Sequence, residues 1–216
     1  MEYKIMHIPI NPKRRPSTKI QPTTITIHNT ANPTSTAHNE RNWLVNQYND
    51  RTASWHIAID DNMAVEAIPL NELAYHAGNT QGNNSSIGIE LCESGDQQRV
   101  WSNAITLIAR MLHERDWGID RVKTHKSWSG KDCPRLILPH WDKFIADIQK
   151  ELDKLNAPPA PEIPDWKKEG IEYLASQGIL NDPKQWTDKA DEPIPVWTAM
   201  TLIARVHKTL KEANNK

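Results

Sequence analysis

Short runs that alternate apolar and polar residues dominate the first two thirds of the chain. In each run β-branched residues recur at every second position, which is the period of a strand with one buried face. Polar and turn-forming residues separate the runs. The pattern predicts four strands, over residues 23–28, 54–59, 86–91 and 121–125.

Apolar residues between and after these runs recur at helical spacing instead. Residues 36–48 and 103–117 predict two helices. A third begins at Pro139, which suits the first turn of a helix, and continues to Leu155 with one apolar stripe. Strands interleaved with helices predict an α/β fold, in which helices cover a sheet.

A proline-rich segment, residues 156–165, divides the chain. Its four prolines in ten positions predict a stiff, extended linker. We therefore expect a first domain over residues 1–155 and a small helical domain over 166–216. Within the second domain, residues 166–177 and 195–211 predict two helices.

The last predicted helix carries an apolar stripe that we expect to be buried. The stripe consists of Val196, Met200, Ile203 and Leu210. Two helices in a segment of this length are marginal for independent folding. We therefore expect the small domain to pack on a second copy of the chain or on another surface.

The composition limits the partners and the compartment. The 216 residues include 26 Lys plus Arg and 27 Asp plus Glu, for a net charge of −1. With no long run of one sign, we expect neither nucleic acid nor a membrane as the main partner. No stretch approaches the roughly 18 apolar residues of a membrane helix, and the first residues lack a secretion signal. We expect synthesis in the cytoplasm without a signal peptide.

Two polar side chains lie on predicted strands and face away from the aliphatic residues. Because Ile25 and Ile27 face one side of the sheet, His28 faces the other. Glu90 is likewise turned away from its apolar neighbours, and a carboxylate in an apolar strand is costly unless it is paired or used. Both are candidates for chemistry. The alternatives are a structural histidine and a carboxylate paired with an arginine.

A second histidine and a cysteine extend this set. His125 closes the predicted strand over residues 121–125, and Cys133 follows after a turn that Gly130 can fold back. Together with the strand histidine, they offer two imidazoles and one thiolate, which are three ligands for a zinc ion with one open position. The spacing is not a standard zinc signature, and a lone strand histidine is more often structural. Cys92 lies among apolar residues and is expected to be a small buried hydrophobe.

Four further aromatic residues are candidates for substrate contact. Trp55 and Trp128 can stack on a sugar ring or belong to the core. Most other histidines are expected to be structural, with His56 and His76 as the exceptions. Lys131, in the turn before the cysteine, is either a solvated turn residue or a charge beside the site.

Five ordered motifs give the chain a family resemblance. The motifs are TIHNTA at 26–31, SWHIAID at 54–60, AYHAGN at 74–79, IGIELC at 87–92 and THKSWSGKDCP at 124–134. They resemble the zinc-dependent N-acetylmuramoyl-L-alanine amidases of type 2, which are related to peptidoglycan recognition proteins and include many phage endolysins. The resemblance covers roughly residues 20–150 and implies a mixed central β-sheet flanked by helices.

The resemblance also implies a role for each site residue. His28, His125 and Cys133 would hold zinc, while Glu90 and Lys131 would flank the scissile amide between N-acetylmuramic acid and L-alanine. Glu90 would then be the general base, and Lys131 would share with zinc the charge on the carbonyl oxygen. In non-catalytic relatives the position of this cysteine typically holds another residue, so its presence favours an enzyme.

The C-terminal segment resembles one S-layer homology repeat. A tryptophan and an apolar helix at residues 165–180 are followed by a second helix that ends in TLIARVHKTL. The usual glycine-rich stretch is replaced by NDPKQWTDKADEP. The alternative is a small dimerisation or spacer unit, through which the chain would form a homo-oligomer.

These features together predict a bacteriolytic enzyme whose partner is bacterial peptidoglycan. We expect a phage or prophage endolysin that reaches the cell wall after release from the host cytoplasm. A tail that binds the wall or self-associates suits an insoluble substrate because tethering raises the effective concentration. The alternatives are a peptidoglycan-binding protein without turnover and a bacterial autolysin or recycling amidase.

Overall fold

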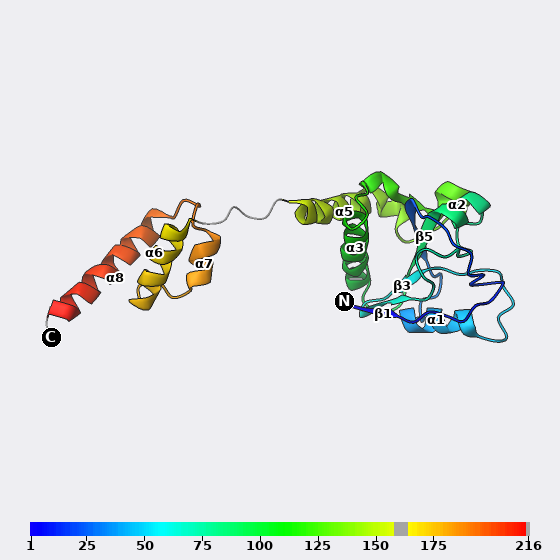
Figure 1. The fold of residues 1–216 in the computed structure, drawn as a ribbon, viewed down its shortest axis with the longest axis horizontal. Coiled ribbons are helices and arrows are strands. Elements are labelled where there is room, and N and C mark those ends of the chain that lie inside the picture. The colour runs from blue at the N-terminus through cyan, green and yellow to red at the C-terminus, as the bar shows by residue number, and fades with distance from the viewer. Residues whose placement is uncertain (158–163, 215–216) are drawn as a thin grey trace. The chain divides into compact units, whose positions relative to one another are not determined.

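The computed structural model describes residues 1–157 and 164–214, which belong to two compact units, Met1–Ala157 and Pro158–Lys216 (Figure 1). The predicted linker over residues 156–165 falls mainly outside the described residues. Its two end residues are helical, because Asn156 ends helix α5 and Asp165 begins helix α6.

A six-stranded mixed sheet forms the centre of the first unit. The strand order is β1-β4-β3-β5-β2-β6, and all neighbouring pairs are parallel except β3 with β4. The strands are β1 (Glu2–Ile5), β2 (Thr24–Asn29), β3 (Ile57–Ile59), β4 (Met63–Glu66), β5 (Ser86–Leu91) and β6 (Val122–Thr124). The central strands β5 and β2 pair with each other along their whole length and with a shorter strand on the other side, which holds their side chains in a fixed register.

Five helices belong to this unit. They are α1 (Ala37–Val45), α2 (Thr80–Ser85), α3 (Gln97–His113), α4 (His125–Ser129) and α5 (Trp141–Asn156). Two short 3-10 turns, Ile119–Arg121 and Leu138–His140, precede β6 and α5.

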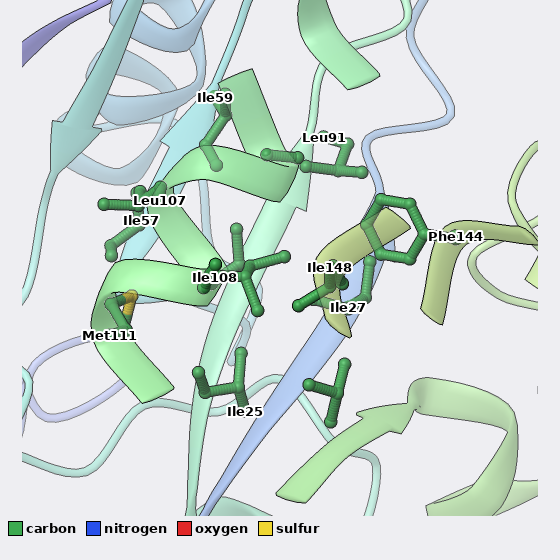
Figure 2. Close-up of a cluster of buried hydrophobic side chains, with 14 of the residues drawn as sticks. Ile25, Ile27, Ile57, Ile59, Leu91, Leu107, Ile108, Met111, Phe144 and Ile148 are labelled. Atoms are coloured by element: carbon green, nitrogen blue, oxygen red, sulfur yellow. The ribbon is translucent and has the colours of Figure 1, made fainter. Parts of the chain in front are cut away.

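The main hydrophobic core lies between the sheet and helices α3 and α5. Ile25 and Ile27 of β2 point to the same side of the sheet as the apolar residues of β3 and β5, as strand alternation requires (Figure 2). Leu107 and Ile108 of α3 and Phe144 of α5 pack onto them. One face of the sheet is thus closed by apolar contacts, so polar side chains of the same strands must lie on the other face.

The second unit is purely helical. It contains α6 (Asp165–Ser176), α7 (Pro183–Asp188) and α8 (Val196–Asn214). Its buried apolar residues include Ile179 and Leu180, which follow α6. The guanidinium of Arg205 on α8 donates to the carbonyl of Ile179 at 2.9 Å, which ties α8 to this small core.

The expected fold class, a mixed sheet flanked by helices with a small helical domain, is confirmed. Several boundaries differ. Helix α3 begins six residues before the predicted start because the Asp96 carboxylate caps it, accepting from the backbone N–H groups of Gln98 and Arg99. Only the second half of the predicted strand 54–59 is β3, since Ser54 donates its backbone N–H to Tyr75 in a loop.

The expected burial of the α8 stripe is wrong. Val196, Met200, Ile203 and Leu210 are 76%, 66%, 68% and 58% exposed. The helix instead turns Leu202 and Val206, both partly buried, toward its own unit. Three helices provide one small core, so the opposite side of α8 stays open.

Strands β1 and β4 were not expected from the sequence. Their four-residue runs are short, and β1 lies at the edge of the sheet with both end residues exposed. Among the residues described, no helix combines the length and the apolar character needed to cross a membrane.

Candidate active site

His28 and Glu90 lie side by side on the polar face of the sheet. They are register partners on the parallel strands β2 and β5. The same face carries Thr26, whose hydroxyl is 2.6 Å from the hydroxyl of Ser86. Because the isoleucines of both strands fill the opposite face, His28 is directed away from the main core, as the alternation predicted.

His125 is brought beside His28 by the strand that precedes it. Strand β6 pairs with β2, and His125 follows β6 as the first residue of α4, rather than as the end of a strand. The helix starts there because the Thr124 hydroxyl accepts the backbone N–H of Ser127 at 3.0 Å. The first turn of α4 thus holds His125 at the edge of the polar face.

Cys133 returns to the same point after α4 ends. Gly130 ends α4 with a left-handed φ of 78°, a conformation that favours glycine. The carbonyl of Cys133 then accepts the backbone N–H of Lys126 at 2.9 Å. The turn therefore folds back, as expected, and buries the thiol next to the two imidazoles.

The three candidate ligands converge. His28 Nδ1 lies 3.0 Å from His125 Nδ1 and 3.8 Å from Cys133 Sγ. One donor atom from each residue lies within 4.8 Å of the others, and all three residues are buried. Two imidazole nitrogens and one thiolate are a donor set that suits zinc. The geometry therefore fits the metal that the sequence predicted.

Burial sets the charge state of these ligands in the metal-free protein. It lowers the pKa of His28 well below its usual value and that of His125 to about 4, helped by Lys131. Both imidazoles are neutral at pH 7 and can offer a lone pair. Burial also raises the pKa of the Cys133 thiol to about 11, so a metal ion must displace its proton.

His76 contacts the far side of His28. Its Nδ1 lies 3.1 Å from His28 Nε2, and its own Nε2 lies 3.0 Å from the carbonyl oxygen of Ser86. Burial, together with the charges that neighbouring histidines would carry, lowers the pKa of His76 to about 3, so the ring is neutral. Although it lines the cavity, both ring nitrogens already have a protein partner.

A cavity of about 790 Å³ opens over the ligands. Glu90 and Lys131 both line it, as expected for residues that flank a substrate. Burial raises the pKa of Glu90 to about 8, and the nearby Glu40 adds to this, while Lys131 opposes it. The Glu90 carboxyl thus lies in a poorly solvated place beside the ligands.

Trp55 also lines the cavity, in the position expected for substrate contact. Its ring stacks on Trp43 with centroids 5.7 Å apart and an interplanar angle of 15°. In the described parts of the chain, three buried side-chain atoms have no hydrogen-bond partner: Trp55 Nε1, Glu90 Oε2 and Arg14 Nε. The first two belong to residues of this cavity, and a buried polar atom without a partner is costly unless a ligand satisfies it.

Two predicted contact residues do not line the cavity. His56 is fully buried, and its ring bonds the carbonyl of Glu72 at 2.8 Å and the N–H of Gly88 at 2.9 Å. The Trp128 indole donates to the Thr26 hydroxyl at 2.8 Å. The His56 ring thus joins a loop to β5, and the Trp128 indole joins α4 to β2, so the expected contact with substrate is not supported for either residue.

The sequence did not point to the polar wall of the cavity. This wall is rich in amide side chains, and its lining residues include Asn29, Asn32, Asn39, Asn42 and Asn46. Glu40 and Arg51 add charged groups to it. Part of the signal was present as a run of polar residues within the predicted helix 36–48, which contains Asn39, Asn42 and Asn46, but a polar helical face is usually only a solvated surface.

Several known proteins are similar in sequence to this chain. Residues 18–136 match the family described as N-acetylmuramoyl-L-alanine amidase. The chain is 39% identical to the N-acetylmuramoyl-L-alanine amidase CwlH of Bacillus subtilis over 146 residues, which cover 65% of this chain and 58% of CwlH. It is 44% identical to XlyB of the same organism over 138 residues, which cover 60% of this chain and 43% of XlyB.

The fold also matches a solved structure. The catalytic domain of XlyA superposes with a TM-score of 0.65 and 40% identity, and the match covers 68% of this chain and 99% of that domain. The chain spans about half the length of the curated relatives it matches. The family match, over residues 18–136, lies in the first unit, which holds the site described above.

Proposed function

The chain belongs to the N-acetylmuramoyl-L-alanine amidase family, and from this premise we propose that it hydrolyses the amide between N-acetylmuramic acid and L-alanine in peptidoglycan. One observation carries the proposal. Two imidazole nitrogens and a thiol converge at a cavity that a carboxyl group and an ammonium group also line. These are the groups that metal-assisted hydrolysis of an amide requires.

The ligand assignment is His28, His125 and Cys133 for one zinc ion. A thiolate with two imidazoles selects a soft or borderline metal over magnesium or calcium. Three protein ligands leave one position open, as in catalytic zinc sites. Bound there, zinc supplies Lewis acidity, which makes water a stronger nucleophile and polarises the amide carbonyl near neutral pH.

Glu90 acts as the general base and then as the general acid. It accepts a proton from the attacking water and returns it to the alanine nitrogen as the carbon–nitrogen bond breaks. Its partner-free Oε2 supports this role. Without a cation on the neighbouring ligands, the Glu90 carboxyl has a pKa of about 8 and is largely protonated at pH 7. A cation on the neighbouring ligands lowers this pKa and favours the carboxylate that the base needs.

Lys131 stabilises the negative charge that develops on the carbonyl oxygen. Its side chain lines the cavity, and its charge is felt at His28, Glu90, His125 and Cys133. The turn that carries Lys131 also carries Cys133, whose N–H donates to the Lys131 carbonyl at 2.7 Å. In this proposal the ammonium group is near the reacting atoms before substrate binds.

The rest of the cavity recognises the glycan and the peptide. The Trp55 indole N–H and the asparagine amides offer donors and acceptors for the acetamido group, the hydroxyls and the peptide backbone of the substrate. The volume of about 790 Å³ is within the range of ligand clefts and accommodates a sugar with the first residues of the stem peptide.

The second unit, in this proposal, attaches the enzyme to the wall or to a second copy of the chain. Support comes from exposed apolar side chains, since Trp166, Trp197 and Val196 are each at least 70% exposed. Large exposed apolar surfaces mark interaction sites. We assign the protein to phage-type lytic enzymes that act on the cell wall, a proposal supported by its 41% identity to a solved mutant endolysin from Bacillus subtilis.

The first test is the release of L-alanine amino termini from purified peptidoglycan. Release by the protein as prepared, its loss after chelation and its recovery with zinc are expected. Glu90→Gln should keep zinc and lose turnover, whereas Glu114→Gln, which changes an exposed carboxylate on the surface, should keep both. A zinc-loaded, folded protein that sediments with the wall but releases nothing would instead be a binding protein.

A further inference from the structure

We propose that His76 is a positioning residue, which holds His28 in the tautomer that presents its Nδ1 lone pair to the metal. The inference rests on the proposed zinc site but concerns a residue outside the ligand set. It also replaces the expected role of His76 in substrate contact.

The hydrogen-bond chain fixes the direction of each proton. The carbonyl oxygen of Ser86 can only accept, so the nitrogen 3.0 Å away, His76 Nε2, carries the proton. In a neutral ring the other nitrogen, Nδ1, is then an acceptor. His28 Nε2, 3.1 Å from it, must therefore be the donor, which leaves His28 Nδ1 without a proton.

This tautomer of His28 is the one that can bind a metal ion at the ligand cluster. His28 Nδ1 is the atom that faces His125 Nδ1 and Cys133 Sγ, at 3.0 and 3.8 Å. Were the proton on Nδ1, it would point into the ligand cluster and no lone pair would be offered there. A metal-binding histidine commonly donates its other N–H to a fixed acceptor, and here that acceptor is a second histidine anchored to the β5 backbone.

The surroundings of His76 are built to keep its ring in place. The Asn83 side-chain oxygen accepts the backbone N–H groups of His76 and Ala77 at 2.9 and 2.8 Å. Gly88 on β5 leaves the space that the ring occupies, since a Cβ atom there would lie 2.5 Å from His76 Cγ. The residue is 7% exposed, and neither ring nitrogen is free for a substrate.

The tautomer can be measured directly on the metal-free protein. Long-range ¹⁵N–¹H correlation spectra distinguish Nδ1–H from Nε2–H in each histidine. We expect His28 and His76 both to be protonated at Nε2 in the wild-type protein. A wild-type His28 protonated at Nδ1 would overturn the proposal, whatever the behaviour of any variant.

Zinc affinity, measured by competition with a chelator, gives the second readout. His76→Leu removes the acceptor and is expected to bind zinc about 10- to 100-fold more weakly. His76→Asn restores an oxygen near the position of Nδ1 and is expected to recover most of the affinity. Gly88→Ala keeps the histidine but displaces its ring, so it should also weaken binding.

A matched control separates positioning from stability. Phe144→Leu weakens the core on the opposite face of the sheet without touching the hydrogen-bond chain, so its zinc affinity should equal that of the wild type. A folded His76→Leu protein with wild-type affinity would refute the assignment. If the His76→Leu protein does not fold, the zinc affinity of Gly88→Ala and the His28 tautomer in the wild-type spectra test the assignment instead. No substrate is used, so a protein that shows this pattern but releases no alanine overturns only the proposed activity.

Discussion

Replacing Glu90 by glutamine is expected to change how the stability of the metal-free protein depends on pH. Burial raises the pKa of this carboxyl from its ordinary 4.5 to about 8 in the folded state. Between these two values the folded protein keeps a proton that the unfolded chain releases, so stability falls as pH rises through the window. Glutamine resembles the protonated acid in shape but cannot ionise, and it therefore removes this loss.

The magnitude follows from the size of the pKa change. A rise from 4.5 to about 8 corresponds to roughly 5 kcal/mol, all of it lost once the pH exceeds the folded-state pKa. Local relaxation and water entry reduce this, so a difference on the order of 2–5 kcal/mol is expected at pH 9. At pH 5 the acid is protonated in the folded state and the two proteins should differ by less than about 1 kcal/mol.

Urea denaturation with a chelator, at pH 5 and pH 9, measures both differences. Other titrating groups are the same in the two proteins and largely cancel in the comparison, and the Cys133 and Cys92 thiols, whose pKa values the Glu90 charge raises, stay protonated in both folded proteins at these pH values. Glu114→Gln alters a surface carboxylate and is expected to change stability by less than about 0.5 kcal/mol at either pH. An equal effect of Glu90→Gln at both pH values would mean that the carboxyl is well solvated, and the reasoning would fail.

Three further predictions concern the same site. Cys133→Ser should lose zinc and activity together, as seen by metal analysis beside the alanine assay, because a hydroxyl is a poor substitute for thiolate. Zinc binding at pH 7 should release between one and two protons, one from the Cys133 thiol with its pKa of about 11 and most of another from Glu90, whose pKa of about 8 the bound cation lowers; calorimetry in buffers of different ionisation enthalpy measures this number. Lys131→Met should retain zinc and lower kcat by about 100-fold or more in steady-state assays. An unchanged kcat would exclude the oxyanion role.

Some features could be predicted because they depend only on neighbouring residues in the chain. The alternation in β2 and β5 alone placed His28 and Glu90 away from the aliphatic face, since successive side chains of a strand must point to opposite sides. Gly130 identified the turn that returns Cys133 to the site, because few other residues adopt its left-handed φ. The order of the motifs then pointed to the family, and the three candidate metal ligands that they contain do converge.

Other features depend on contacts between distant segments, and only the tertiary structure decided them. The Trp128 indole donates to Thr26, and the Trp55 ring stacks on Trp43. Both partners lie in other elements, so the sequence next to each tryptophan did not show which of the two lines the cavity. The α8 stripe looked like a core stripe because its spacing does not reveal which side the rest of the unit covers. His76 is the clearest case. Its ring contacts a carbonyl group ten residues away in the chain and an imidazole 48 residues away, and the residues next to His76 in the sequence do not reveal either contact.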